Sequence, residues 1–174
     1  MADDKLEIML SAEQIEERVK ELAAEISRDY KDKKPLLVGV LKGAVIFLSD
    51  LIRYLDIPVE LDFMAVSSYG ADTASSGVVR IQKDLEQSIK GKDVIVVEDI
   101  VDTGLTLNYL YKNLSDRQPN TLKVITLLDK PDRRKVDFNA DYCGFKIPDK
   151  FVIGYGLDYA DDFRYLADLC ILKN

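Results

Sequence analysis

The sequence contains no histidine, and only two of its 174 residues are cysteine. Without histidine, the chain has no Ser-His-Asp or Cys-His catalytic set, no histidine-ligated zinc and no histidine-ligated haem. The two cysteines, Cys143 and Cys170, form no CxxC pair and make a poor disulfide framework. We therefore expect two unreactive thiols in a reducing compartment.

Long apolar runs and an excess of basic residues are also missing. The longest apolar run is far shorter than a membrane span, and the charged segment from Met1 to Ile8 reads as neither a signal peptide nor an anchor. The 24 basic residues are outnumbered by 31 acidic ones, for a net charge of −7. We expect a cytoplasmic protein with no nucleic-acid or membrane partner, in which any phosphate is held locally by backbone amides, a metal or a few lysines.

The chain does have enough apolar sequence, 47% of its residues, to bury a core. A capping box at Ser11 to Gln14 opens a helix whose apolar residues keep helical spacing as far as Tyr30. Beyond it, helices at 44–55 and about 103–116 alternate with apolar strands at 36–41, 59–67, 78–84, 94–97 and 122–128. This alternation predicts an α/β fold with a mostly parallel sheet flanked by helices.

The length fits one domain, spanning 1–174, at roughly 150 residues per domain. We expect its core at about 35–129. The sequence becomes charged after Lys130-Pro131, and the later strand candidates, 151–155 and 166–172, are short. We expect a small hood there, from about 130–174, together with the N-terminal residues.

The most informative segment runs from Val94 to Thr106, with the sequence VIVVEDIVDTGLT. Its acidic pair, Glu98-Asp99, is expected at the carboxyl end of a buried strand, where ligands bind in parallel sheets. The hydroxyl-rich stretch from Asp102 to Thr106 then leads into a helix, so its backbone N–H groups can converge on a phosphate. Taken alone, the two acids are also consistent with a solvated strand end. Asp102 or Thr103 could equally be an ordinary helix N-cap.

This segment resembles the phosphoribosyl diphosphate signature of the type I phosphoribosyltransferases. Further segments resemble the hypoxanthine-guanine branch of that family: Leu41-Lys42-Gly43, Ser68-Tyr69, Lys130, the run 147–155, Leu157-Asp158-Tyr159 and Phe163-Arg164. The resemblance covers roughly residue 36 to the C-terminus. Leu105 differs, because some relatives carry lysine there. The implied fold is the type I phosphoribosyltransferase fold with its hood.

The resemblance implies that a 6-oxopurine, hypoxanthine or guanine, displaces diphosphate from phosphoribosyl diphosphate to give IMP or GMP in purine salvage. Glu98 and Asp99 would face the ribose hydroxyls and stabilise a cationic sugar. Asp102 would act as general base near N7 of the purine. The 5′-phosphate would lie on the loop residues that follow, Thr103, Gly104, Leu105 and Thr106.

The leaving diphosphate would be held by Lys42-Gly43 and Arg164, and the peptide bond at Lys42 can be cis in relatives. Taken alone, Lys42 and Arg164 read as solvated surface residues. The implied cofactor is Mg²⁺, with Asp158 as a metal-side carboxylate beside Glu98 and Asp99, since hard oxygen ligands and phosphates suit this ion.

Recognition of the base would depend on Lys130, Phe151 and Val152, with Asp158 close by. Lys130 can donate to a purine O6, which also explains why adenine would be rejected. Taken alone, Phe151 is expected in the core. Ser68 and Tyr69 would begin a lid that excludes water from the sugar cation. Family members usually form homodimers or homotetramers, so we expect a homo-oligomer.

Three other interpretations fit parts of the sequence. Asp102-Thr103-Gly104 is also the triplet of aspartic proteases, but there is one copy and it opens a helix. A nucleotide sensor that binds RNA would need a basic face, whereas lysine and arginine are interspersed with acids here. A phosphoribosyltransferase for adenine, xanthine, uracil or orotate is the third, and Lys130 with the Phe151-Val152 segment favours a 6-oxopurine.

Overall fold

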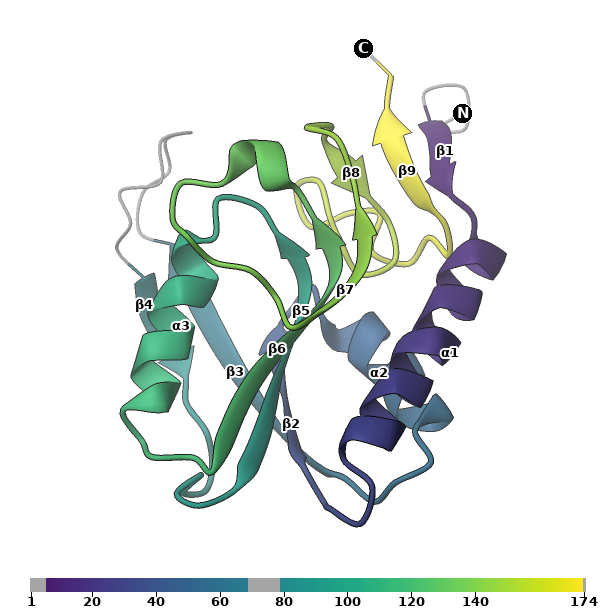
Figure 1. Ribbon diagram of the computed structural model, residues 1–174. Helices are drawn as coiled ribbons and strands as arrows, with labels where there is room; N and C mark the ends of the chain where they lie inside the picture. Colours follow the sequence, from purple (N-terminus) through teal and green to yellow (C-terminus); the bar gives the residue numbers. More distant parts are fainter. Residues whose placement is uncertain (1–5, 69–78, 174) are drawn as a thin grey trace.

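The computed structural model describes residues 6–68 and 79–173 as two sheets flanked by helices (Figure 1). The larger sheet has the strand order β4-β3-β2-β5-β6-β7, and every neighbouring pair is parallel except β3 and β4. Its strands are β2 (Leu36–Leu41), β3 (Glu60–Ser68), β4 (Val79–Lys83), β5 (Asp93–Val101), β6 (Thr121–Asp129) and β7 (Tyr142–Lys146). The predicted α/β fold with a mostly parallel sheet is confirmed.

Helices cover both faces of this sheet. Figure 1 shows α1 (Ala12–Asp29) and α2 (Val45–Tyr54) on one face and α3 (Leu105–Ser115) on the other. In β5, Ile95 and Val97 join the core cluster of α1 and α2, whereas Val94 and Val96 join that of α3. Because successive strand residues point to opposite faces, a continuous apolar run is what such a doubly covered strand requires.

The first helix begins as predicted. Ser11 is its N-cap: the Ser11 side chain accepts from the Gln14 N–H, and the Gln14 side chain accepts from the Ser11 N–H. Its buried residues are those with helical spacing, namely Ile15, Val19, Leu22, Ala23 and Ile26. None of the three α-helices among the described residues combines the length and apolarity that a bilayer crossing needs.

A second, smaller sheet is formed by three strands that are distant in sequence. It has the order β1-β9-β8, with β1 (Leu6–Leu10), β9 (Leu169–Leu172) and β8 (Val152–Ile153) all antiparallel. Figure 1 shows it beyond the carboxyl ends of β5 and β6. The smaller sheet is therefore next to the edge where a ligand of the larger sheet would bind.

Two strands differ from the sequence prediction. We expected all residues after about 130 in the hood, but β7 pairs in parallel with β6 as an edge strand of the larger sheet. The crossover contains only the short 3₁₀ helix η2 (Pro131–Arg133), so no helical spacing signals it. We also expected β5 to end at Val97, but its pairing with β6 continues to Val101, which places Glu98 and Asp99 inside the strand.

Candidate active site

The loop between β5 and α3 borders a small cavity. The cavity has a volume of about 90 Å³ and is lined by Glu98, Ile100, Val101, Asp102, Thr103, Gly104, Thr106 and Leu107. Gly104 is the N-cap of α3 and has φ = 81°, a left-handed conformation that glycine adopts without strain. The alternative in which Asp102 or Thr103 is the N-cap is therefore wrong. Gly104 has no side chain to cap the helix, and the Leu105 N–H donates to Oγ1 of Thr103 at 3.4 Å. The positive end of the helix dipole at this loop still favours an anion.

A basic segment after β6 braces this loop. Arg134 donates from Nη1 to the main-chain oxygen of Asp102 at 2.7 Å, and the Lys135 N–H donates to the Thr103 oxygen at 2.9 Å. A Cβ on Gly104 would lie 3.0 Å from Cδ of Arg134. Arg134 is in turn ion-paired with Asp129 at the end of β6. The loop is thus held by its neighbours through main-chain and side-chain contacts.

Arg133 contacts the carboxylate of Asp102 directly. Its Nε donates to Oδ1 of Asp102 at 2.7 Å, and its Nη1 lies 3.6 Å from Oδ2 of Asp149. This contact raises the pKa of the Arg133 guanidinium. Neither Arg133 nor Arg134 was predicted as a site residue, and the one signal for them in the sequence is the charged run that follows Pro131.

In the acidic pair of β5, Glu98 is buried and Asp99 is partly buried. Glu98 is 8% exposed, and its Oε1 accepts from the Asp99 N–H at 3.2 Å. Burial, and next the negative charge of Asp99, holds the pKa of Glu98 well above its ordinary value. Burial also raises the pKa of Asp99, although its carboxylate accepts from the Ile100 N–H at 2.7 Å. The pair therefore favours a positively charged ligand nearby.

The loop after β2 packs against this acidic pair. The Leu41–Lys42 peptide bond is cis. A Cβ on Gly43 would lie 1.7 Å from Oδ2 of Asp99, so only glycine fits against that carboxylate. A Cβ on Gly156 would lie 2.3 Å from the carbonyl oxygen of Gly43, so the two glycines are packed closely together. Three segments that are far apart in sequence therefore meet at Gly43.

Arg164 lies at the same junction. It donates from Nη1 to the Gly156 oxygen at 2.7 Å, and its Nη2 is 2.7 Å from Oδ1 of Asp158. Lys42 reaches the same loop, with its Nζ 3.2 Å from Oδ1 of Asp161. The structure thus brings together Lys42, Gly43, Asp158 and Arg164, as the sequence interpretation requires.

The predicted base-binding residues lie on two segments. Lys130 is 7% exposed, and its N–H donates to the Val101 oxygen at 2.9 Å, directly before Asp102. Phe151 is 55% exposed and contacts Tyr159 edge to face, with ring centroids 5.7 Å apart. The expectation that Phe151 alone would be a core residue is wrong. Val152 is buried in β8.

Two other predicted features have different outcomes. Ser68 is the last residue of β3, whereas Tyr69 and most of the predicted lid lie outside the described residues. Cys143 and Cys170 are both free, and burial raises the pKa of each thiol, as expected for unreactive cysteines.

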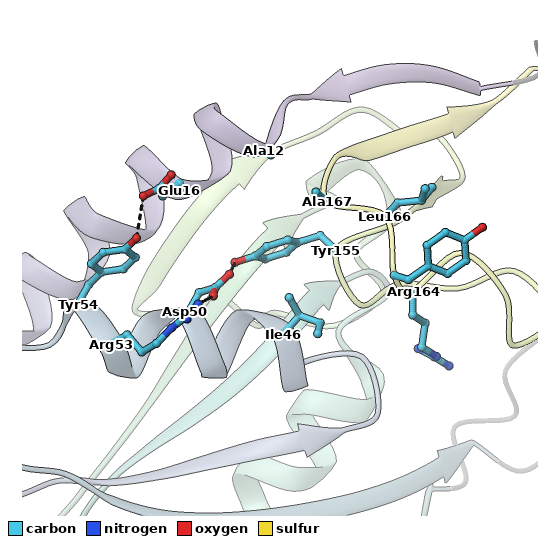
Figure 2. Close-up of a pocket in the computed structure, with 11 residues that line it drawn as sticks. Ala12, Glu16, Ile46, Asp50, Arg53, Tyr54, Tyr155, Arg164, Leu166 and Ala167 are labelled. Carbon is cyan, nitrogen blue, oxygen red and sulfur yellow. Dashed lines mark hydrogen bonds and ion pairs between the residues drawn. The ribbon is translucent and has the colours of Figure 1, made fainter. Parts of the chain in front are cut away.

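A larger cavity of about 350 Å³ lies between α1, α2 and the segment 164–167. Figure 2 shows Tyr155 reaching Asp50 on α2 and Tyr54 reaching Glu16 on α1. In this cavity the Tyr155 hydroxyl donates to Asp50 at 2.6 Å, and the Tyr54 hydroxyl donates to Glu16 at 2.7 Å. The tyrosine hydroxyls of this cavity are paired with carboxylates, and Arg164, which also lines it, is bound by the Gly156 oxygen and Asp158. The smaller cavity at α3 is therefore the better candidate for chemistry.

The carboxylates suit a divalent cation that is shared with a ligand. Within the described residues, no three side chains of the histidine, cysteine or acidic types form a ready-made metal cage. Glu98 is a buried acid and Asp99 a partly buried one, both with raised pKa values, and Oδ1 of Asp158 is 2.7 Å from Nη2 of Arg164. One or two carboxylates completed by ligand phosphates is the coordination that Mg²⁺ favours. The residues therefore fit Mg²⁺ bound together with a phosphorylated ligand.

Comparisons with known proteins agree with this geometry. The family model for the phosphoribosyl transferase domain matches residues 7–160. The hypoxanthine-guanine phosphoribosyltransferase of Bacillus subtilis (strain 168) is 50% identical over 173 residues, which cover 99% of this chain and 96% of the relative.

Two solved structures are similar over most of their length. A hypoxanthine phosphoribosyltransferase from Staphylococcus aureus has a TM-score of 0.95 and 48% identity, with 98% of this chain and 93% of that chain covered. A hypoxanthine phosphoribosyl transferase from Trypanosoma cruzi, studied for the role of its C-terminal region in oligomeric state and activity, has a TM-score of 0.91 and 47% identity, with 96% and 91% covered.

Proposed function

This chain belongs to the phosphoribosyltransferases, and we propose that it is the enzyme of purine salvage that joins hypoxanthine or guanine to phosphoribosyl diphosphate. The reaction transfers the 5-phosphoribosyl group to N9 of the base and yields IMP or GMP and diphosphate. The family, the enzyme class and this reaction are those predicted from the sequence.

One observation carries the proposal. A glycine-capped helix N-terminus and the buried carboxyl group of Glu98 border the same small cavity, between β5 and α3. The helix end attracts a phosphate group, while buried acids favour a cation. A phosphorylated sugar that becomes positively charged in the transition state matches both at once.

In this proposal, the 5′-phosphate binds the N–H groups and hydroxyls of the loop from Thr103 to Thr106. Glu98 and Asp99 accept from the ribose hydroxyls and stabilise the positive charge that develops at the anomeric carbon. Leu105 has no side-chain donor, and its backbone N–H, which donates to Oγ1 of Thr103 at 3.4 Å, would turn to the phosphate. The phosphate therefore depends on the backbone and the helix dipole.

The diphosphate would bind where Lys42, Gly43 and Arg164 converge. Gly43 supplies a backbone that only a residue without Cβ can place against Asp99. Mg²⁺, held with the substrate by Glu98, Asp99 and Asp158, would neutralise charge on the departing diphosphate. Arg164, already oriented by the Gly156 oxygen, would contribute a second cation.

The base would stack on Phe151, whose exposed ring is free to contact a purine. Lys130 would donate to O6, the Val152 backbone would pair with the ring edge, and Asp158 would lie nearby. Asp102 would take the proton from N7 as the bond to N9 forms. Arg133 keeps the Asp102 carboxylate in place beforehand.

A spectrophotometric assay with phosphoribosyl diphosphate, Mg²⁺ and one nucleobase at a time tests the proposal. We expect nucleotide formation with hypoxanthine or guanine and none with adenine, because Lys130 cannot donate to an amino group. Efficient turnover of adenine, uracil or orotate, or of no base at all, would contradict the proposal. Including xanthine in the same series shows whether the site discriminates between purines that differ at C2.

The assembly is a further part of the proposal. We expect a homodimer or homotetramer, in which both sheets of each chain act as one domain around the site. Sedimentation or light scattering of the full chain measures the oligomeric state, and a purely monomeric species at assay concentrations would contradict this expectation.

A further inference from the structure

One carboxylate lies between the two cations that are assigned to the diphosphate. Oδ1 of Asp161 is 3.2 Å from Nζ of Lys42 and 3.7 Å from Nη2 of Arg164. A single oxygen placed between an ammonium and a guanidinium group reproduces the contacts that an oxygen of a phosphate group would make.

The loop does not need this carboxylate for its shape. The Asp161 side chain is 77% exposed, and exposed ion pairs contribute little to stability. The turn is closed by main-chain bonds from Tyr159 N–H to the Asp162 oxygen at 3.2 Å and back at 3.1 Å. The Asp161 N–H is also bound by Oδ2 of Asp158. The contacts of Asp161 with the two cations therefore call for another explanation.

Asp161 and a diphosphate compete for the same donors. Both are anions, and like charges a few ångströms apart repel each other where water screens incompletely. A diphosphate that binds Lys42 and Arg164 must displace Asp161 or accept its charge nearby. The carboxylate therefore weakens the binding of any ligand that ends in a diphosphate.

We propose that Asp161 is a positioning residue that occupies the diphosphate subsite when the ligand is absent and limits the affinity of that subsite. This inference rests on the proposed function, specifically on Lys42 and Arg164 as the diphosphate ligands. Asp161 keeps the two cations near the positions they need, and its return speeds departure of the diphosphate product. The affinity for the purine base does not depend on it.

The test is Asp161→Asn in the full chain, with Asp162→Asn as the matched control. Asp161 has φ = 63°, a left-handed conformation that asparagine tolerates well, so the loop should keep its shape. Asp162 is next to it and equally acidic, but its carboxylate accepts from the Phe163 N–H. The measurements are the KM for phosphoribosyl diphosphate, the inhibition constant of diphosphate, the KM for the base and the Mg²⁺ requirement.

We expect Asp161→Asn to lower both the KM for phosphoribosyl diphosphate and the inhibition constant of diphosphate by about three- to tenfold. The effect should shrink as salt is added. Asp162→Asn should leave both constants within about twofold, and Asp161→Glu, which keeps the charge, should resemble the original chain. The KM for the base and the Mg²⁺ requirement should not change.

Three results would overturn the inference: unchanged or weaker diphosphate binding in Asp161→Asn, an equal gain in Asp162→Asn, or a raised Mg²⁺ requirement, which would make Asp161 a metal ligand. Lys42→Ala separates this failure from that of the proposed function. If Lys42→Ala raises the KM for phosphoribosyl diphosphate while Asp161→Asn has no effect, only the role of Asp161 is wrong. If Lys42→Ala leaves that KM unchanged, the diphosphate assignment fails as well.

Discussion

At the scale of single residues, Asp102 is held before any substrate arrives. Arg133 donates to its carboxylate, and Arg134 donates to its main-chain oxygen. A general base must be oriented toward the proton that it removes, and two contacts from one neighbouring segment provide that orientation. The carboxylate remains 42% exposed, so a ligand in the cavity can still reach it.

Replacing Asp102 by asparagine tests the assigned chemistry. Asparagine keeps an oxygen that can accept from Arg133 but cannot take a proton, so kcat should fall by about 10²–10⁴-fold. The KM values should change by only a few fold, because the shape of the site is retained. Steady-state kinetics measures both. Turnover close to that of the original chain would exclude Asp102 as the general base.

Phe151 allows a second test at this scale, because its ring is 55% exposed. Phe151→Leu should raise the KM for the purine about tenfold through lost stacking, since a stacked base is worth about 1–3 kcal/mol. The melting temperature should hardly change, because an exposed ring adds little to the core. Phe151→Tyr, which keeps the aromatic face, serves as the control. A stability loss as large as that of a core substitution would disprove the assignment.

Local sequence was sufficient to predict which candidate site residues lie together when they are neighbours along the chain. The segment from Glu98 to Thr106 forms a continuous strand, loop and helix, so its members remain neighbours in the fold. Arg133 and Asp161 could not be predicted in this way. Their partners, Asp102 and Lys42, are distant in sequence, and only the folded chain brings them together.

At the scale of elements, α1 satisfies the free edge of β7. Arg18 donates from Nε to the Gly144 oxygen at 3.0 Å and from Nη2 to the Cys143 oxygen at 2.8 Å. An edge strand exposes main-chain groups on one side, and a helix that covers the edge hides them from other strands. This contact connects the first helix to the last strand of the larger sheet.

Arg18→Met should therefore cost stability at this edge. It removes charged donors from two carbonyl groups, and hydrogen bonds to charged groups contribute about 1.5–3 kcal/mol. Lys20→Met, two residues away, removes an exposed pair with Glu16 and a cation–π contact with the Tyr54 ring at 5.1 Å, and it should cost about 1 kcal/mol. Urea unfolding of both variants measures the difference. Equal losses would show that the edge contact is unimportant.

Elements with strong periodicity were predictable, and those defined by pairing were not. The spacing from Ile15 to Ile26 predicts α1 because one face of the helix is buried. β7 has a mixed sequence with a glycine, and its position depends on register with β6. β5 extends to Val101 because its partner β6 continues alongside it. The acidic residues Glu98 and Asp99 interrupt the apolar run, so the sequence alone predicts an earlier end of the strand.

At the scale of the whole molecule, the buried carboxyl group of Glu98 links stability to pH. Burial holds the folded-state pKa of Glu98 well above the ordinary value of 4.5 that it has in the unfolded chain. The folded state therefore binds this proton more tightly than the unfolded state does. The contribution of this proton to the free energy of unfolding is fully present below about pH 4.5, and it is lost as the pH rises through the elevated folded-state pKa.

Glu98→Gln should therefore stabilise the free protein at pH 8 while it lowers activity. Glutamine keeps the shape of the side chain but carries no charge, so its advantage over glutamate should grow with pH. We expect a gap in melting temperature of at least about 2–4 °C at pH 8, the shift that 1 kcal/mol produces in a chain of this size. Thermal scans with EDTA at pH 5 and pH 8 measure it. A gap independent of pH would contradict the assigned burial cost.

The pairing of β1 with β9 also constrains when the chain can finish folding. Leu6 is opposite Leu172, so β1 has no partner strand until residue 172 has left the ribosome. Arg164 lies just upstream of β9. The nascent enzyme can therefore form most of its larger sheet early, yet the segment that carries Arg164 is fixed in place only after β9 has been synthesised.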